Sequence, residues 1–333
     1  MTYLSEILLR VKALSVGIKS IKNIDMAVEE VSLNIRNGEI LGIVGESGCG
    51  KSLTALALAG LLPKDAIITQ GSIIFDGTEL KGISKDKMRK IQGKDISIIF
   101  QEPMTSLNPL LTIGKQVGEG LRIHYKFTER EIKERVLDVL NKVGLPMAKE
   151  VYNSYPHQLS GGMRQRVMIA IAIICKPKLI IADEPTTALD VTIQAQILKL
   201  LRDINKEYNT SILFISHDLG VISRLCHRVI VMYAGSLVEE GTVKNIFLNP
   251  THQYTKGLIA SIPTMDKRGK RLVNISGKVP SIQEKRFGCR FSSRCEKAEE
   301  KCFYELPPSV NLGPNHRVCC NLAIKESGED YVI

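Results

Sequence analysis

The stretch GESGCGKS, residues 45 to 52, decides how this chain folds. It matches the phosphate-loop pattern G-x-x-x-x-G-K-[ST], follows an apolar run that reads as a strand, and opens a predicted helix. Glycines let backbone N–H groups curl around phosphates, and the helix N-terminus adds the positive end of its dipole. A glycine-rich turn before a purely structural helix is the alternative, but the complete pattern in this context favours a phosphate site.

The residue types in this loop predict its chemistry. Lys51 supplies a mobile positive charge to the β- and γ-phosphates of a nucleotide, and Ser52 offers its hydroxyl to Mg²⁺. The rest of the predicted ATP-binding loop consists of Ser47, Gly48, Cys49 and Gly50.

A second element, LIIADEP at residues 179 to 185, is a buried hydrophobic strand that ends in two carboxylates. Buried carboxylates are costly unless a cation or a reaction uses them. Asp183 is placed to hold Mg²⁺, directly or through a water, and Glu184 can polarise the attacking water as general base. Strands often end in solvated acidic residues, so this pair alone is weak evidence for a nucleotide site. Together with the phosphate loop it is strong evidence.

Short apolar runs alternate with helical patterns over the first 250 residues, which predicts an α/β domain with a mainly parallel sheet. The region from about 105 to 175 shows helical patterns and few strands, so we expect a helical subdomain there. Helices are expected over Thr128–Val143 and Thr192–Tyr208. The expected strands are Glu39–Val44, Ile96–Phe100, Lys178–Ala182, Ser211–Ile215 and Val229–Tyr233.

The composition of the chain shifts near Pro250. We therefore expect a nucleotide-binding domain over 1–250 and a small, separate, irregular extension over 251–333. Residues 266 to 286 hold seven Lys or Arg against two acidic residues, and five of the eight cysteines follow between 289 and 320.

The 333-residue chain carries a net charge of +10, which suggests an anionic partner such as a nucleotide, a nucleic acid or an acidic membrane face. With 44% apolar and 24% charged residues it reads as globular. No stretch reaches the roughly 18 to 20 apolar residues that span a bilayer, and the N-terminus lacks a secretory signal pattern. We expect the chain in the cytosol, where thiols stay reduced.

LSGGMRQR, residues 159 to 166, is the third element. It resembles the signature sequence of ABC ATPases, and the order of Gln101, this signature, Asp183-Glu184 and His217 fits that family. The resemblance implies a P-loop ABC ATPase core with a helical subdomain. By itself His217 would more often be a structural histidine. The resemblance implies instead the switch histidine that contacts the γ-phosphate and acts beside Glu184.

The resemblance also implies that two such subunits face each other head to tail. The phosphate loop of one would bind ATP against the signature of the other, through Ser160, Gly161, Gly162 and Gln165. A helix N-terminus opened by Ser-Gly-Gly can bring backbone donors close to a γ-phosphate. Asp190 would lie where the two active sites communicate. Gln101 would join Ser52 and Asp183 at the ATP-bound Mg²⁺.

Three longer stretches resemble the oligopeptide/dipeptide importers, a group that also includes nickel transporters: GESGCGKSLTALALAGLLP, FQEPMTSLNPLLTIG and YPHQLSGGMRQRVMIAIA. The resemblance implies an ATPase that energises peptide import from the cytoplasmic face of the membrane. Its implied partners are two membrane-spanning permease subunits, a second related ATPase and an extracytoplasmic peptide-binding protein. Gln101 would link the nucleotide state to the permease. Peptide and nickel both stay open as cargo, because an energising subunit never touches it.

One position departs from the family, which usually stacks an aromatic residue on adenine upstream of the phosphate loop. The matching residue here is Ile18, which would pack on the purine with help from Val28. An aliphatic side chain lacks the stacking contribution of about 0.5 to 1.5 kcal/mol. We therefore expect weaker nucleotide selectivity.

The clustered cysteines need a reason in a cytosolic chain, because unpaired thiols or adventitious disulfides poorly explain five cysteines in 32 residues. Structural zinc usually uses C-x2–4-C pairs, which are missing here, so Zn²⁺ is the lesser alternative. The segment resembles the C-terminal extension of the same importers, which implies a [4Fe–4S] cluster on Cys289, Cys295, Cys302 and Cys320. The family pattern H-x-V-x-C selects Cys320 over Cys319. Because the ATP site looks complete without this cluster, we expect ATP binding to be independent of it.

Two other classes of protein fit less well. A soluble ABC ATPase acting on nucleic acid would suit the positive charge and the cysteines, but the chain has one cassette, no long coiled-coil insertion and no basic–aromatic stripe. We therefore expect no nucleic-acid partner. A P-loop kinase has no use for the signature sequence.

Overall fold

The computed structural model describes residues 6–21, 23–187, 189–263, 275–284 and 287–323. The chain divides into two compact units that alternate along the sequence. The first, here named the helical unit, comprises residues 1–7, 35–39 and 82–215. The second, the loop unit, comprises residues 8–34, 40–81 and 216–333.

The helical unit contains three parallel strands in the order β6 (Ile96–Ile99), β7 (Leu179–Asp183) and β8 (Ser211–Ser216). Every residue of β7 and β8 is buried. Unbroken apolar runs of this kind are typical of parallel strands that are covered on both faces. The functional loops of this unit therefore begin at the ends of apolar, largely buried strands.

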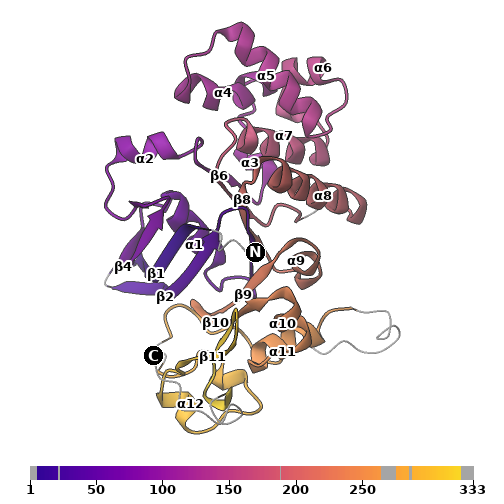
Figure 1. The fold of residues 1–333 in the computed structure, drawn as a ribbon. Coiled ribbons are helices and arrows are strands. Elements are labelled where there is room, and N and C mark those ends of the chain that lie inside the picture. The colour runs from indigo at the N-terminus through magenta and orange to yellow at the C-terminus, as the bar shows by residue number, and fades with distance from the viewer. Residues whose placement is uncertain (1–5, 22, 188, 264–274, 285–286, 324–333) are drawn as a thin grey trace. The chain divides into compact units, whose positions relative to one another are not determined.

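Helices make up most of the helical unit. Four of them, α4, α5, α6 and α7, pack on one another (Figure 1). The helical segments of the unit are α2 (Lys85–Ile91), α3 (Pro103–Ser106), α4 (Ile113–His124), α5 (Glu129–Lys142), α6 (Ala148–Asn153), the 3-10 turn η1 (Pro156–Gln158), α7 (Gly161–Ile173) and α8 (Val191–Tyr208).

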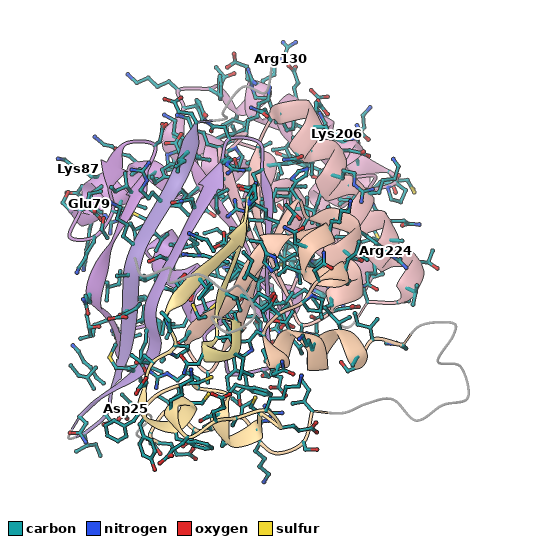
Figure 2. The ribbon with its side chains drawn as sticks, turned by 60° about the horizontal axis from the view of Figure 1, so that its bottom comes forward. Asp25, Glu79, Lys87, Arg130, Lys206 and Arg224 are labelled. Carbon is teal, nitrogen blue, oxygen red and sulfur yellow. The ribbon has the colours of Figure 1, made fainter. Side chains whose placement is uncertain are left out.

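Helix α5 shows why these segments are helical. Thr128 and Glu131 form a capping box, which satisfies backbone donors at the helix N-terminus. Ile132, Val136 and Leu140 follow at intervals of four residues and are buried. On the other face, charged side chains such as Arg130 project outward (Figure 2). The helix is therefore amphipathic and buries one stripe.

The loop unit contains an antiparallel sheet that the sequence analysis does not anticipate. Its strand order is β2 (Ile24–Arg36), β1 (Ile7–Lys19), β4 (Ala66–Phe75) and β5 (Thr78–Glu79). β1 runs antiparallel to β4, with register shifts between Lys12 and Val16. Polar residues interrupt both long strands, so neither reads as a short apolar run.

Five further strands of the loop unit belong to an eight-stranded sheet, in the order β11 (Ser309–Gly313), β12 (His316–Cys319), β10 (Ser236–Thr242), β9 (Arg228–Tyr233) and β3 (Ile40–Val44). β3 and β9 are parallel, and the other neighbours are antiparallel. The helical segments of this unit are α1 (Lys51–Ala59), α9 (Leu219–Leu225), α10 (Val243–Leu248), α11 (Gln253–Ala260), η3 (Ser292–Arg294) and α12 (Lys301–Tyr304).

The C-terminal extension is not separate from this sheet, in contrast to the expectation from composition. β12 pairs with β10, and the His316 ring lies 2.9 Å from the buried carboxylate of Glu239. Val310, Val318, Cys320 and Ala323 form a small core of their own. Much of the basic stretch from Lys267 lies outside the described residues. None of the described helices has the length and apolar character needed to cross a membrane.

Candidate functional site

The predicted phosphate loop connects β3 to α1 within the loop unit. Gly50, which precedes α1, has φ +97°, and a Cβ built there would lie 2.9 Å from the carbonyl oxygen of Ala27. Only glycine combines that backbone conformation with so close an approach. Ser47, Gly48 and Ser52 are exposed, so the loop opens to solvent at the N-terminus of α1.

Lys51 is turned into this loop. Its side chain is only 5% exposed, and Nζ donates hydrogen bonds to the carbonyl oxygens of Gly45 at 2.8 Å and Glu46 at 2.9 Å. Burial raises the pKa of the neighbouring Cys49 thiol, despite the opposing effect of Lys51, so this side chain stays neutral. Cys49 can therefore serve a nucleotide only through its backbone, as a small buried residue.

The two predicted carboxylates follow β7 in the helical unit. Asp183 is the last residue of the strand and is 8% exposed. Glu184 has φ +46°, a left-handed conformation that is unfavourable for a residue with a Cβ, and its N–H donates to the carbonyl of Ile215 at 3.0 Å. Backbone strain of this kind is common at functional sites, where it orients a side chain.

Glu184 and Gln101 are in direct contact. Gln101 Nε2 donates to Glu184 Oε2 at 3.2 Å, and Thr187 Oγ1 donates to the same oxygen at 2.9 Å. These two donors hold the carboxylate in one orientation, which suits a general base that must meet a water from a fixed direction. Sequence reasoning missed Thr187; its position three residues after Glu184 in a turn was the available signal.

The residues of the predicted hydrolysis site belong to both units. Gln101, Asp183 and Glu184 belong to the helical unit. The phosphate loop and the exposed His217, which directly follows β8, belong to the loop unit. Each group lies at the carboxyl end of its strand, the edge at which ligands of open α/β sheets bind.

The signature residues begin α7. Ser160 is the N-cap, and its Oγ accepts from the N–H of Met163 at 3.4 Å. A Cβ on Gly161 would meet nothing within 4 Å, so the surface in front of the helix is open. An exposed N-terminus on a 13-residue helix can donate backbone hydrogen bonds to an anion presented from outside.

Gln165 and Asp190 differ in their exposure. Gln165, one turn beyond the exposed cap of α7, is only 2% exposed. Its contact with a nucleotide bound to another subunit stays a prediction. Asp190 is exposed and is the N-cap of α8, its Oδ1 accepting from Ile193 N–H at 2.9 Å.

The two residues expected near adenine lie on β1 and β2. Ile18 is half-buried near the end of β1, whereas Val28 is fully buried. A Cβ on Gly50 would lie 3.1 Å from Val28 Cγ2, which places Val28 against the phosphate loop.

Four cysteines of the extension converge on one small cavity of about 20 Å³. Its lining includes Cys289, Cys295, Cys302 and Cys320, together with His252, Phe291 and Asn321. Burial raises the pKa of Cys289 to about 11, and the nearby thiols of Cys320, Cys302 and Cys295 add to the rise. Within the described residues, however, no group of three or more His, Cys, Asp or Glu side chains is arranged to hold a metal ion.

The alternation of β12 separates the two adjacent cysteines. His316 and Val318 are buried on one face, and Cys320, two residues on, is buried on the same side. Cys319 points to the other face and lines a different, larger cavity of about 470 Å³. In the pattern H-x-V-x-C, His316 contacts the Glu239 carboxylate, Val318 is a core residue, and Cys320 lines the smaller cavity.

Comparison with known proteins shows which families the chain matches. A protein family described as "ABC transporter" matches residues 28–187. A second, described as "Oligopeptide/dipeptide transporter, C-terminal region", matches residues 238–302. The second match includes Cys289, Cys295 and Cys302.

Similar proteins align with nearly the whole chain. The oligopeptide transport ATP-binding protein AppD of Bacillus subtilis is 49% identical over 91% of this chain and 93% of its own length. The dipeptide transport ATP-binding protein DppD of Haemophilus influenzae is 45% identical over 96% of this chain and 97% of its own length.

Among solved structures, a dimeric ATP-binding cassette in a post-hydrolysis state bound to ADP and Pi is 31% identical, with a TM-score of 0.64. It aligns with 71% of this chain and 98% of its own length. The α/β fold with its helical unit agrees with these matches. The chain therefore belongs to the oligopeptide/dipeptide family of ABC transporter ATP-binding proteins, ATPases that drive peptide import.

Proposed function

We propose that this chain binds ATP on its phosphate loop and hydrolyses it with Glu184 as general base, as an energising subunit of a peptide importer. The observation that carries this proposal is the oriented Glu184 carboxylate, held by Gln101 and Thr187 directly after the strand that ends in Asp183. In this proposal Ser52 and Asp183 hold Mg²⁺, with Gln101 beside them. Lys51 and His217 face the phosphates.

A second subunit supplies the rest of the proposed site. Ser160, Gly161 and Gly162 form an open helix N-terminus that suits a γ-phosphate held by another cassette. A similar cassette is dimeric, which supports a pair of cassettes; the head-to-tail arrangement is part of the proposal. Asp190, at the exposed start of α8, is the proposed point of communication between the two sites.

The proposed membrane partner would dock near Gln101. Phe100, which precedes Gln101, is 39% exposed, and Leu110 in the following loop is 82% exposed. The Ile113 N–H donates to the Ser154 carbonyl at 2.8 Å, which ties the end of this loop to the end of α6. Exposed apolar side chains beside a residue that contacts the general base suit a helix of a permease subunit, because its docking would then reach Glu184.

The purified transporter tests this assignment. It should contain two permease subunits, one copy of this chain and one copy of a related ATPase, and vesicles holding it should take up dipeptides when ATP is supplied on the side of the ATPases. Native mass measurement and labelled-peptide uptake are the two readouts. Two copies of this chain without another ATPase would contradict the heterodimer, and uptake of nickel in place of peptide would change the cargo.

For the extension, we propose that Cys289, Cys295, Cys302 and Cys320 hold a [4Fe–4S] cluster. Support comes from their shared cavity and from the orientation of Cys319 away from it. A four-iron cube places each of its four ligands on a different iron, so it would use all four of these thiols. Because the cavity is only about 20 Å³, the surrounding loops would have to open around the cluster. Folding and cluster binding would then be coupled.

Anaerobically purified protein should be brown and carry about four iron and four sulfide per chain. Cys320→Ser should lose the colour and make the C-terminus more sensitive to protease, because a cluster ligand is gone. Cys319→Ser is the matched control, one residue away on the opposite face of β12, and should keep both properties. Equal loss in the two variants would contradict the ligand set. Colourless wild-type protein with one bound zinc would replace the cluster by a zinc site.

A further inference from the structure

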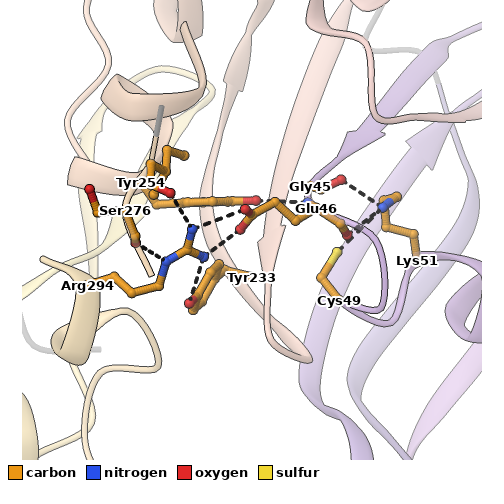
Figure 3. Close-up of polar contacts among 9 residues, drawn as sticks. Gly45, Glu46, Cys49, Lys51, Tyr233, Tyr254, Ser276 and Arg294 are labelled. Atoms are coloured by element: carbon orange, nitrogen blue, oxygen red, sulfur yellow. Dashed lines mark hydrogen bonds and ion pairs between the residues drawn. The ribbon is translucent and has the colours of Figure 1, made fainter. Parts of the chain in front are cut away.

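A segment of the extension reaches back to the phosphate loop. Arg294, in η3, donates from Nη1 to Glu46 Oε2 at 2.7 Å and from Nη2 to Glu46 Oε1 at 3.1 Å (Figure 3). Glu46 directly follows Gly45 in the loop that binds phosphate, 248 residues earlier in the chain. Two parallel bonds between guanidinium and carboxylate fix direction as well as distance.

The other donors of Arg294 are also engaged. Nε donates to the carbonyl of Ser276 at 2.8 Å, Nη2 to the carbonyl of Ile275 at 3.1 Å, and Nη1 to the hydroxyl of Tyr233 at 3.2 Å. The arginine side chain is only 3% exposed. A buried, fully engaged guanidinium is a rigid anchor for the carboxylate it holds.

Glu46 is held through its backbone as well. Its N–H donates to the hydroxyl of Tyr254 at 2.8 Å (Figure 3). Tyr254 packs against Tyr233 and against Phe291 of the extension, with ring centroids 4.6 Å and 5.4 Å away. Phe291 and Arg294 both lie between Cys289 and Cys295, so one short segment supplies the aromatic packing and the charge.

The held residue is also a partner of the phosphate-binding lysine. Lys51 Nζ donates to the carbonyl oxygens of Gly45 and Glu46, so the position of residue 46 determines where the ammonium is held. We propose that Arg294 is a positioning residue of the ATP site: by holding Glu46, it keeps the phosphate loop in the shape that turns Lys51 inward. Arg294 itself does not touch the nucleotide.

This role makes the extension part of the ATP site. The expectation was that ATP binding is independent of the cluster; the Arg294–Glu46 ion pair nevertheless links the segment between two of its cysteines to the phosphate loop. The inference rests on ATP binding by the phosphate loop and on contacts within the protein, and it does not depend on what the cysteine cavity holds. Arg294 is nevertheless followed directly by Cys295, so any change that reshapes the cavity acts one residue from this contact.

The test compares nucleotide affinity in four variants of the full chain, by titration with a fluorescent ATP analogue. Arg294→Gln and Glu46→Gln should each weaken affinity about tenfold, the scale of a lost charge-assisted hydrogen bond. The double variant should be no worse than the weaker-binding single variant, because the two changes remove one interaction. Arg290→Gln is the matched control: Arg290 lies in the same segment but pairs with Glu29 on β2 instead of with a residue of the loop.

Further measurements separate positioning from simple support of the fold. In the assembled transporter, KM for ATP should rise by a similar factor while kcat stays within about twofold. Arg294→Lys should recover part of the affinity, because it keeps the charge but loses the bidentate geometry. If Arg294→Gln fails to fold, Glu46→Gln still tests the contact, since it leaves the other bonds of Arg294 in place.

Unchanged affinity in folded Arg294→Gln and Glu46→Gln would overturn the inference. So would an equal loss in Arg290→Gln, which would indicate general damage to the segment. If the wild-type protein holds no iron and the Arg294 effect persists, the cluster proposal fails while the positioning role stands. If the wild-type chain binds no ATP analogue, the failure lies in the proposed ATP site itself.

Discussion

Glu184→Gln should bind ATP as well as the wild-type chain does and hydrolyse it at least about a hundredfold more slowly, the scale of losing a general base. The amide keeps the shape of the side chain and can still meet Gln101 and Thr187 after turning, but it cannot accept a proton from water. In the proposed dimer, hydrolysis releases the two subunits, so the variant should accumulate as an ATP-bound pair. Single-turnover ATP hydrolysis and size-exclusion chromatography with ATP measure the two effects.

The matched control is Glu134→Gln, the same chemical change on the exposed face of α5. Glu134 pairs only with Arg130 in solvent, an interaction of little energetic value, so turnover should be unchanged. In the transporter, the substitution must be present in both ATPase subunits, because a second intact site would mask the loss. Wild-type turnover with both sites changed would rule out Glu184 as the base.

The parts of the fold that the sequence predicts best are the short buried strands. β3, β6, β7, β8 and β9 all lie within one residue of the expected bounds. Each is a run of apolar residues bounded by polar or turn residues, so hydrophobicity alone marks it. The long strands β1 and β2 were not predicted, because charged residues such as Lys12 and Glu29 interrupt them. β1 also pairs with β4, a strand further along the chain, and such pairing leaves no local signal.

The candidate site residues belong to contiguous motifs. The phosphate loop, Asp183-Glu184 and the signature each occupy a few consecutive residues whose chemistry is evident, so the sequence alone proposes them. A motif gives the order of residues but not which side of a helix they face, so the burial of Gln165 became visible only in the structure. The Arg294–Glu46 pair could not be predicted at all, since two charged residues 248 positions apart carry no pattern that links them.

Lys51→Ala should lose most ATP affinity, about a hundredfold, and all transport. The ammonium donates two hydrogen bonds inside the loop, to Gly45 and Glu46, and with nucleotide bound it would face the β- and γ-phosphates instead. Each charge-assisted hydrogen bond contributes about 1.5 to 3 kcal/mol, so two account for the expected loss. Equilibrium binding of labelled ATP to the full chain measures the affinity, and peptide uptake by the reconstituted transporter measures the function.

Two further variants test whether the lost positive charge causes the loss of ATP affinity in Lys51→Ala. Lys199→Ala removes an ammonium from the exposed face of α8, where it pairs with Asp203, and should leave binding and transport intact. Lys51→Gln keeps a donor within reach of the loop carbonyls while removing the charge, so it should preserve thermal stability better than alanine yet still lose ATP affinity. Wild-type uptake by a transporter with Lys51→Ala would refute the phosphate-site assignment, because no other residue of the loop carries a positive charge.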